Sequence, residues 1–157
     1  MESLKNKKAP LFTLPNEKGE QVALESFLGK KNVILYFYPK DMTPGCTTEA
    51  CDFAAAYEDF SDLDAVILGV SPDPAERHEK FIAKHNLPFS LLVDTDVKVA
   101  EAYGVWQLKK NFGKEYMGIV RSTFLINKEG IVQEEWRNVR VKDHVAKVAA
   151  VLRGENE

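Results

Sequence analysis

The residues with the clearest chemical potential are two cysteines, Cys46 and Cys51, in a chain of 157 residues. Cys46 directly follows Pro44-Gly45, a dipeptide that interrupts regular structure. From Cys46 through Phe60 the composition is typical of a helix. Cys46 is therefore expected in the first turn of a helix, where free N–H groups and the helix dipole favour a thiolate over a thiol. We predict a nucleophilic Cys46; the alternative is a buried and inert cysteine.

The spacing of the two cysteines opposes a simple disulfide. On a regular helix, residues five apart differ by about 7.5 Å in rise and about 140° in rotation. Their Cα atoms would be roughly 8.6 Å apart, beyond the ~7 Å limit for a disulfide. A bond between Cys46 and Cys51 would therefore require the first turns of the helix to unwind. That requirement is unusual for a structural disulfide and reasonable for a redox switch.

The elements around Cys46 indicate how it is positioned. Residues 32–38 form an apolar and aromatic run typical of a buried strand, which Pro39 ends. Residues 65–70 form a second short apolar run, typical of a strand buried on both faces. Because a helix joins these two strands, we expect them to be parallel. The order is strand, tight loop, helix, with Cys46 at the start of the helix.

The rest of the chain continues the alternation of strands and helices. A β-hairpin is predicted at residues 10–14 and 21–24, followed by a short helical turn at 26–28. Helices are predicted at 46–60, 75–85, from a cap at 94–96 to Tyr103, and at 142–152; further strands are predicted at 90–93, 119–126 and 131–136. Residues 107–115 are polar and are predicted to form a surface loop. This pattern implies an α/β sandwich with a mixed sheet.

Composition disfavours several classes of function. Hydrophobic residues make up 45% and charged residues 29% of the chain, both ordinary for a globular protein with one core. The net charge of −3 gives no electrostatic support for a nucleic-acid or anionic-membrane partner. No apolar run reaches the ~18 residues of a membrane span, and the N-terminus lacks the apolar core of a signal peptide. We therefore expect a cytoplasmic protein.

The motif Pro39-x-x-x-Thr43-x-x-Cys46 resembles the active-site motif of the peroxiredoxins. Cys51 is similar to the second cysteine of the subgroup called bacterioferritin comigratory protein, or PrxQ. Further segments keep the family's order along nearly the whole chain: Gly69-Val70-Ser71-x-Asp73, His78-x-Lys80-Phe81, Leu87-Pro88-Phe89, Tyr103-Gly104-Val105-Trp106 and Arg121-Ser122-Thr123-Phe124-Leu125-Ile126. The resemblance implies a thioredoxin-like sandwich with a central mixed sheet and an N-terminal β-hairpin, in a single domain over residues 1–157.

The resemblance also implies a thiol-dependent peroxidase that reduces hydrogen peroxide and organic hydroperoxides. Cys46 would attack the peroxide and become a sulfenic acid, and Cys51, the only other thiol, would condense with it to give an intramolecular disulfide. An external dithiol such as thioredoxin would then reduce that disulfide. The subgroup further implies a monomer or weak homodimer. Neither a metal nor a cofactor is expected.

Three further residues are assigned to the site. The hydroxyl of Thr43 could accept a hydrogen bond from the peroxide and donate one to the thiolate, with a helix N-cap or a loop-stabilising residue as the alternative. Pro39 has no N–H and could shield the sulfur from water, besides ending the strand. Arg121 could stabilise the thiolate and the leaving oxygen, although a lone arginine at a strand edge usually faces solvent. Glu49 could orient Arg121, but carboxylates near a helix N-terminus usually interact with the dipole, so Glu49 is left out.

Other functions compete with a peroxidase. A thiol–disulfide oxidoreductase would use C-x-x-C, whereas four residues separate Cys46 from Cys51, and Thr43 and Arg121 would have no evident role. A redox sensor would oxidise Cys46 to signal to a partner instead of turning over with a recycling dithiol. A zinc site is disfavoured because two cysteines and three scattered histidines lack the paired spacing of zinc ligands.

Overall fold

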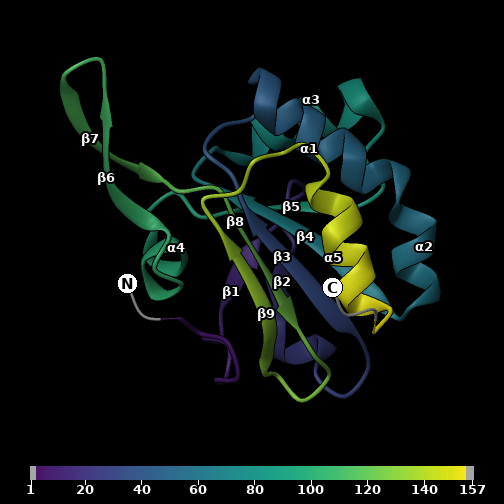
Figure 1. Cartoon of the computed structure of the whole chain (residues 1–157). Helices are drawn as coiled ribbons and strands as arrows, with labels where there is room; N and C mark the ends of the chain where they lie inside the picture. The colour runs from purple at the N-terminus through teal and green to yellow at the C-terminus, as the bar shows by residue number, and fades with distance from the viewer. Residues whose placement is uncertain (1–2, 155–157) are drawn as a thin grey trace.

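A five-stranded mixed sheet forms the centre of the computed structural model, which describes residues 3–154 (Figure 1). The strands follow the order β5-β4-β3-β8-β9. Their bounds are β3 Asn32–Phe37, β4 Ala65–Ser71, β5 Ser90–Val93, β8 Ser122–Ile126 and β9 Val132–Arg137. β3 and β4 are parallel, which confirms the prediction for residues 32–38 and 65–70, and β5 is parallel to β4. β8 runs antiparallel to both β3 and β9.

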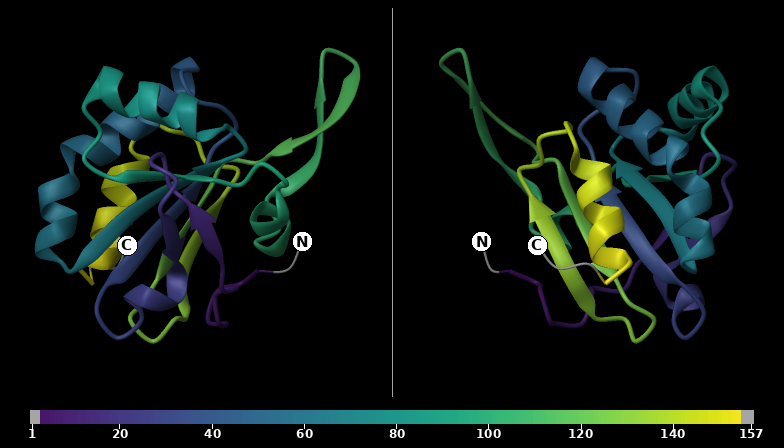
Figure 2. Two further views of the ribbon diagram at one scale, coloured as in Figure 1. Left: turned by 180° about the vertical axis from the view of Figure 1, so that it is seen from behind. Right: turned by 45° about the vertical axis from the view of Figure 1, so that its right-hand side comes forward.

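Four helices cover one face of the sheet (Figure 2). They are α1 Pro44–Ala55, α2 Tyr57–Asp62, α3 Ala75–His85 and α5 His144–Leu152. Ile34 and Tyr36, at alternate positions of β3, belong to one apolar core with Phe53 of α1, Phe81 of α3 and Val148 of α5. The side chains that face these helices therefore fix where α1 lies on the sheet.

The opposite face of the sheet is covered by an N-terminal β-hairpin and two short helices. These are β1 Thr13–Pro15, β2 Gln21–Ala23, the 3₁₀ helix η1 Leu24–Phe27 and α4 Lys98–Ala102. Val33, Leu35 and Phe37 of β3 belong to this second core, together with Leu24 and Tyr103. Because both faces are covered, β3 is apolar at consecutive positions and does not alternate with polar residues. The predicted hairpin and helical turn are confirmed.

The packing of α1 on the sheet depends on a glycine in β4. The rings of Tyr36 and Phe53 stack with their centroids 4.7 Å apart. A Cβ atom at Gly69 would lie 2.8 Å from Cζ of Tyr36 and 2.7 Å from Cδ2 of Leu91. Both distances are too short for an ordinary contact, so a side chain at this position would displace its neighbours. Gly69 thus leaves room for the ring on which α1 packs.

The structure corrects the predicted helix at 46–60. The helix begins earlier, at Pro44, because proline suits the first helical position. It is also interrupted at Ala56, whose backbone angles of φ −95° and ψ 4° are not helical, and this break separates α1 from α2. Cys46 and Cys51 both lie before the break, within the same uninterrupted helix.

The loop predicted at residues 107–115 is wrong. The chain there forms a second hairpin, β6 Trp106–Asn111 and β7 Lys114–Ile119, which projects from the body of the protein (Figures 1 and 2). Most of its residues are polar or exposed, so the alternation that reveals a half-buried strand is absent. The predicted strand at 119–126 is correspondingly divided, because β7 ends at Ile119 and β8 begins at Ser122.

The carboxyl ends of β3, β4 and β5 meet at one edge of the sheet. The loop from Pro39 to Thr43 leaves β3 at this edge and leads directly into α1. No helix among residues 3–154 is long and apolar enough to cross a bilayer. The prediction of one domain over residues 1–157 stays a prediction, and the ends of that range lie outside the described residues.

Candidate active site

Cys46 is the third residue of α1. Thr43 occupies the N-cap position and Pro44 the first helical position, and the N–H of Thr47 donates to the carbonyl oxygen of Thr43 at 2.8 Å. The Cys46 side chain is buried and its thiol is free. The N–H groups of a first turn have no partner within the helix, and the positive end of the helix dipole lies there. Cys46 is therefore where the sequence predicts it, in surroundings that favour a thiolate.

The pairing of β3 with β8 brings Arg121 to Cys46. In this antiparallel register Phe37 is opposite Ser122, so Arg121 lies level with Tyr38, the residue that follows β3. From there the side chain reaches α1, and Nη2 of Arg121 donates to Sγ of Cys46 at 3.3 Å. The alternative that Arg121 faces solvent is wrong, because its side chain is only 17% exposed.

Glu49 holds the other arm of the same guanidinium. Nη1 of Arg121 donates to Oε1 of Glu49 at 2.7 Å, and the Glu49 side chain is fully buried. Glu49 follows Cys46 by three residues, a spacing that places both side chains on one helix face. A Cβ atom at Gly45 would lie 3.2 Å from Nη2 of Arg121, so this glycine leaves space for the guanidinium. The carboxylate is therefore placed to orient Arg121, and the expectation that Glu49 interacts only with the helix dipole is wrong.

Burial controls the ionisation of this pair. It raises the pKa of Glu49 from 4.5 to about 7, although the charge of Arg121 and its hydrogen bond oppose the shift. The second carboxylate oxygen, Oε2, has no hydrogen-bond partner among the described residues. Burial lowers the pKa of Arg121, but Glu49 and Cys46 outweigh that effect and raise the pKa overall. Arg121 therefore stays charged, and Glu49 is the member of the pair that titrates.

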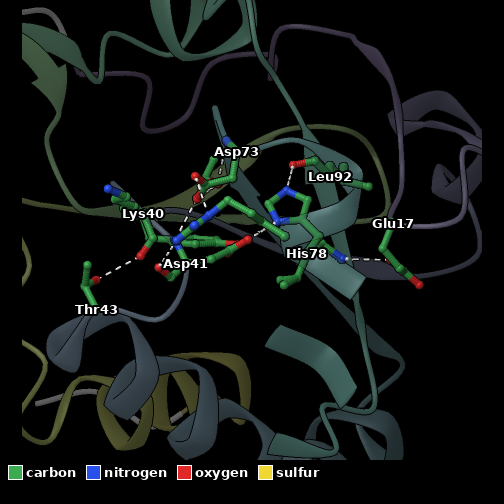
Figure 3. Close-up of polar contacts among 11 residues, drawn as sticks. Glu17, Lys40, Asp41, Thr43, Asp73, His78 and Leu92 are labelled. Atoms are coloured by element: carbon green, nitrogen blue, oxygen red, sulfur yellow. Dashed lines mark hydrogen bonds and ion pairs between the residues drawn. The ribbon is translucent and has the colours of Figure 1, made fainter. Parts of the chain in front are cut away.

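Thr43 and Pro39 both lie in the loop that leads from β3 into α1. The hydroxyl of Thr43 donates to the carbonyl oxygen of Lys40 at 2.8 Å (Figure 3). Thr43 thus occupies the N-cap position without a side-chain cap hydrogen bond, and its hydroxyl stabilises the loop instead of donating to the sulfur. With its hydrogen engaged, the oxygen of Thr43 retains lone pairs that can accept a hydrogen bond. Pro39 is half-buried, two residues after the end of β3; its shielding of the sulfur stays a prediction.

Cys51 lies on α1 as a free and half-buried thiol. The helix is continuous from Pro44 to Ala55, so the spacing of about 8.6 Å that regular geometry gives for the two Cα atoms applies. The structure thus keeps the two sulfur atoms apart. The predicted pairing of Cys46 with Cys51 requires a different conformation of α1.

The β6–β7 hairpin brings a second cation towards the site. Nζ of Lys109 donates to the carbonyl oxygen of Ile119 at 2.8 Å, two residues before Arg121. Burial lowers the pKa of Lys109, and the charge of Arg121 lowers it further, whereas Cys46 raises it. Lys109 is not predictable as a site residue when residues 107–115 are taken as a loop.

The histidines considered as metal ligands are engaged in other contacts. Nδ1 of His78 lies 2.6 Å from Oδ2 of Asp41, and Nε2 of His144 lies 2.8 Å from Oγ1 of Thr123. The His85 ring packs edge-on against an aromatic neighbour. In the part of the chain from residue 3 to residue 154, no group of three or more His, Cys, Asp and Glu side chains could hold a metal ion.

Comparisons with known proteins identify the family. Residues 6–135 match the model of the AhpC/TSA family. Peroxiredoxin Bcp from Bacillus subtilis (strain 168) is 63% identical over 150 residues, which cover 96% of this chain and 95% of the relative. This chain belongs to the AhpC/TSA family of peroxiredoxins. A structure of peroxiredoxin Q from Xanthomonas campestris superposes on this peroxiredoxin with a TM-score of 0.87 and 41% identity, covering 91% of this chain and 90% of the other.

A second structure, of the bacterioferritin comigratory protein from X. campestris, has a TM-score of 0.87 and 40% identity, with the same coverage. That structure belongs to a set of trapped intermediate and ligand complexes that concern the alkyl peroxide reduction activity of the X. campestris protein. These relatives confirm the predicted family, the Bcp/PrxQ subgroup, the thioredoxin-like fold and the enzyme class, a thiol-dependent peroxidase. The roles of individual residues in this peroxiredoxin stay predictions.

We expect Glu49→Gln to change how the stability of the reduced protein depends on pH. The folded protein binds the Glu49 proton more tightly than the unfolded chain, because burial raises this pKa to about 7. The contribution of Glu49 to stability is therefore fully present below about pH 4.5 and is lost as pH rises through about 7. Urea unfolding should show the wild type losing stability relative to Glu49→Gln across that interval.

The comparison between the two proteins removes the effects of groups that they share. One such group is His144, whose pKa burial lowers to about 4, so that its own contribution is lost as pH falls. Glu58→Gln on α2 is the matched control, because Glu58 is exposed, and its difference from wild type should vary little with pH. A constant difference between wild type and Glu49→Gln would contradict the buried, titrating Glu49.

We expect Arg121→Lys to slow the reaction of Cys46 with hydrogen peroxide by about tenfold to hundredfold. A lysine is a single cationic centre and cannot reproduce the two-armed contact with Sγ of Cys46 and Oε1 of Glu49. Rapid-mixing measurement of thiol loss gives the rate constant. Arg140→Lys, at an exposed position, should react like wild type. An unchanged rate in Arg121→Lys would exclude the directed guanidinium as a source of the reactivity.

Proposed function

We propose that this peroxiredoxin reduces hydrogen peroxide and organic hydroperoxides through Cys46 and Cys51. The supporting observation is the hydrogen bond from Nη2 of Arg121 to Sγ of Cys46, at 3.3 Å and at the start of α1. A guanidinium N–H and a helix N-terminus at the same sulfur stabilise its anionic form. The reported alkyl peroxide reduction by the X. campestris relative supports organic hydroperoxides as a substrate class.

In the first step the Cys46 thiolate attacks one oxygen of the hydroperoxide. An S–O bond forms while the O–O bond breaks, so that sulfur is oxidised to a sulfenic acid and the other oxygen leaves as an alkoxide or hydroxide that takes up a proton. Arg121, already at the sulfur, is placed to stabilise the negative charge that develops on the leaving oxygen. The free lone pairs on Thr43 are suited to accept the O–H of the bound peroxide.

In the second step the Cys51 thiol attacks the sulfenic sulfur. An S–S bond forms and the sulfenic oxygen leaves as water. Because α1 is regular over both cysteines, this step follows local unwinding of the helix, a low-energy opening of one segment of the fold. An external dithiol then returns two electrons and two protons and restores both thiols.

The external dithiol is proposed to be thioredoxin or a similar protein, acting on a monomer or weak homodimer in the cytoplasm. The membership in the peroxiredoxin family supports a dithiol reductant. The half-buried position of Cys51 on α1 also supports it, because unwinding of α1 would expose the disulfide to a partner.

We expect one equivalent of hydrogen peroxide to remove both thiols of the wild type with a mass loss of two hydrogens, whereas Cys51→Ser should gain one oxygen. Intact mass and thiol titration after rapid mixing measure both results. Cys46→Ser is the matched control and should keep its remaining thiol unmodified over the same time. A wild type that keeps both thiols and its mass would overturn the peroxidatic role of Cys46. Oxygen gained on Cys51 in the Cys46→Ser variant would reverse the assignment.

A further inference from the structure

A buried polar cluster lies beneath the loop that connects β3 to α1 (Figure 3). Its members are Tyr38, Asp41 and His78, each at most 1% exposed. The Tyr38 hydroxyl donates to Oδ1 of Asp41 at 2.5 Å, and Nδ1 of His78 lies 2.6 Å from Oδ2 of the same carboxylate. Nε2 of His78 donates to the carbonyl oxygen of Leu92 at 2.8 Å. A carboxyl group this deeply buried needs partners, and here both of its oxygens have one.

Asp41 is also held through its main chain. Its N–H donates to Oδ2 of Asp73 at 2.6 Å, and its carbonyl oxygen accepts from Nη2 of Arg77 at 3.1 Å. These partners come from the segment between β4 and α3 and from α3 itself, and none of them lies on α1. Asp41 is therefore fixed to the sheet and to α3, whatever the conformation of α1.

The hydrogen bonds define how many protons the cluster holds. Nε2 of His78 faces a carbonyl oxygen and must carry a proton. One further proton lies between Nδ1 of His78 and the Asp41 carboxylate, on either atom. Burial holds the pKa of Tyr38 well above its ordinary value, so that its hydroxyl stays a donor. Every polar atom of the cluster is satisfied without a residue from the catalytic motif.

The fixed Asp41 determines the position of its neighbours in the loop. The carbonyl oxygen of Lys40 accepts the hydroxyl of Thr43, so the orientation of Thr43 depends on the peptide that joins Lys40 to Asp41. Met42, which follows Asp41 in the loop, has φ 65°. This left-handed conformation is unfavourable for a residue with a side chain. Such a conformation persists where its surroundings hold it, and the bonds to Asp41 supply that restraint.

We propose that Asp41 and His78 are positioning residues for peroxide reduction: they fix the Lys40–Thr43 loop so that Thr43 faces the peroxide, independently of α1. This inference rests on the proposed role of Cys46. The proposed role of the cluster is confined to the first step, the attack of Cys46 on the peroxide. The second step, in which α1 unwinds, does not need the loop to be held.

The isosteric variant Asp41→Asn distinguishes positioning from a charge effect. An asparagine oxygen can accept from the Tyr38 hydroxyl, and its amide can donate to Nδ1 of a neutral His78 that still donates through Nε2. All the side-chain hydrogen bonds are thereby kept while the carboxyl group, with any negative charge that it carries, is removed. Asp41→Ala keeps none of the side-chain bonds and releases the loop.

The experiment measures the rate of oxygen gain on Cys46 by quenched rapid mixing and intact mass, with every variant made in the Cys51→Ser protein. We expect Asp41→Ala to be slower by about tenfold or more, the size of effect that a misplacement of about 1 Å produces. Asp41→Asn should stay within about threefold of the parent, with the same dependence of rate on pH. The rate of Tyr38→Phe, which removes one hydrogen-bond donor to Asp41, should lie between the rates of Asp41→Ala and Asp41→Asn. This variant replaces Asp41→Ala in the test if Asp41→Ala does not fold.

Asp94→Ala is the matched control for a general loss of stability. Asp94 is also buried, and its side chain accepts from the N–H groups of Val99 and Ala100 and not from a residue of the loop. It should lower the melting temperature and leave the rate within about twofold. A rate loss in Asp94→Ala equal to that in Asp41→Ala, or failure of Asp41→Asn to retain the rate, would overturn the positioning role. If the parent Cys51→Ser protein itself gains no oxygen, the proposed function fails instead.

Discussion

The regular geometry of α1 is the constraint on which the rest of this peroxiredoxin depends. The helix presents Cys46 at its first turn, which carries free N–H groups, and Arg121 reaches the sulfur there. The same helix keeps Cys51 about 1.4 turns further on, pointing in another direction. The folded helix therefore builds the site that attacks a peroxide and at the same time prevents the disulfide. Under the proposed function, the two halves of the catalytic cycle require two conformations of one segment.

The contacts that hold α1 differ in kind along its length. Near its start, Glu49 is buried against Arg121 and burial brings its pKa to about 7, so this ionic contact carries a substantial desolvation cost. Further along, Phe53 stacks on Tyr36 and anchors the helix through apolar packing. The loop before α1 is fixed separately through Asp41. The part of α1 around Glu49 lies between these two anchors, so its local unwinding in the proposed cycle would leave the sheet intact.

Residues that belong to a motif can be predicted from the sequence. Residues whose contacts depend on the pairing register of distant strands cannot. The positions of Cys46 and Arg121 follow from the motif and from the resemblance to the family. Glu49 was excluded because a carboxylate in the first turns has an ordinary explanation; only the pairing of β3 with β8 shows that Arg121 reaches it. The β6–β7 hairpin and Lys109 were missed because a hairpin that projects into solvent lacks the apolar alternation that burial imposes.

The most direct test of this account is amide hydrogen exchange in the reduced protein and in the protein oxidised by one equivalent of hydrogen peroxide. We expect the amides of residues 47–55, protected by α1 in the reduced state, to lose protection in the disulfide form, while those of β3 keep theirs. Cys51→Ser treated in the same way should retain protection throughout. Equal protection of residues 47–55 in both redox states would contradict the coupling of disulfide formation to the unwinding of α1.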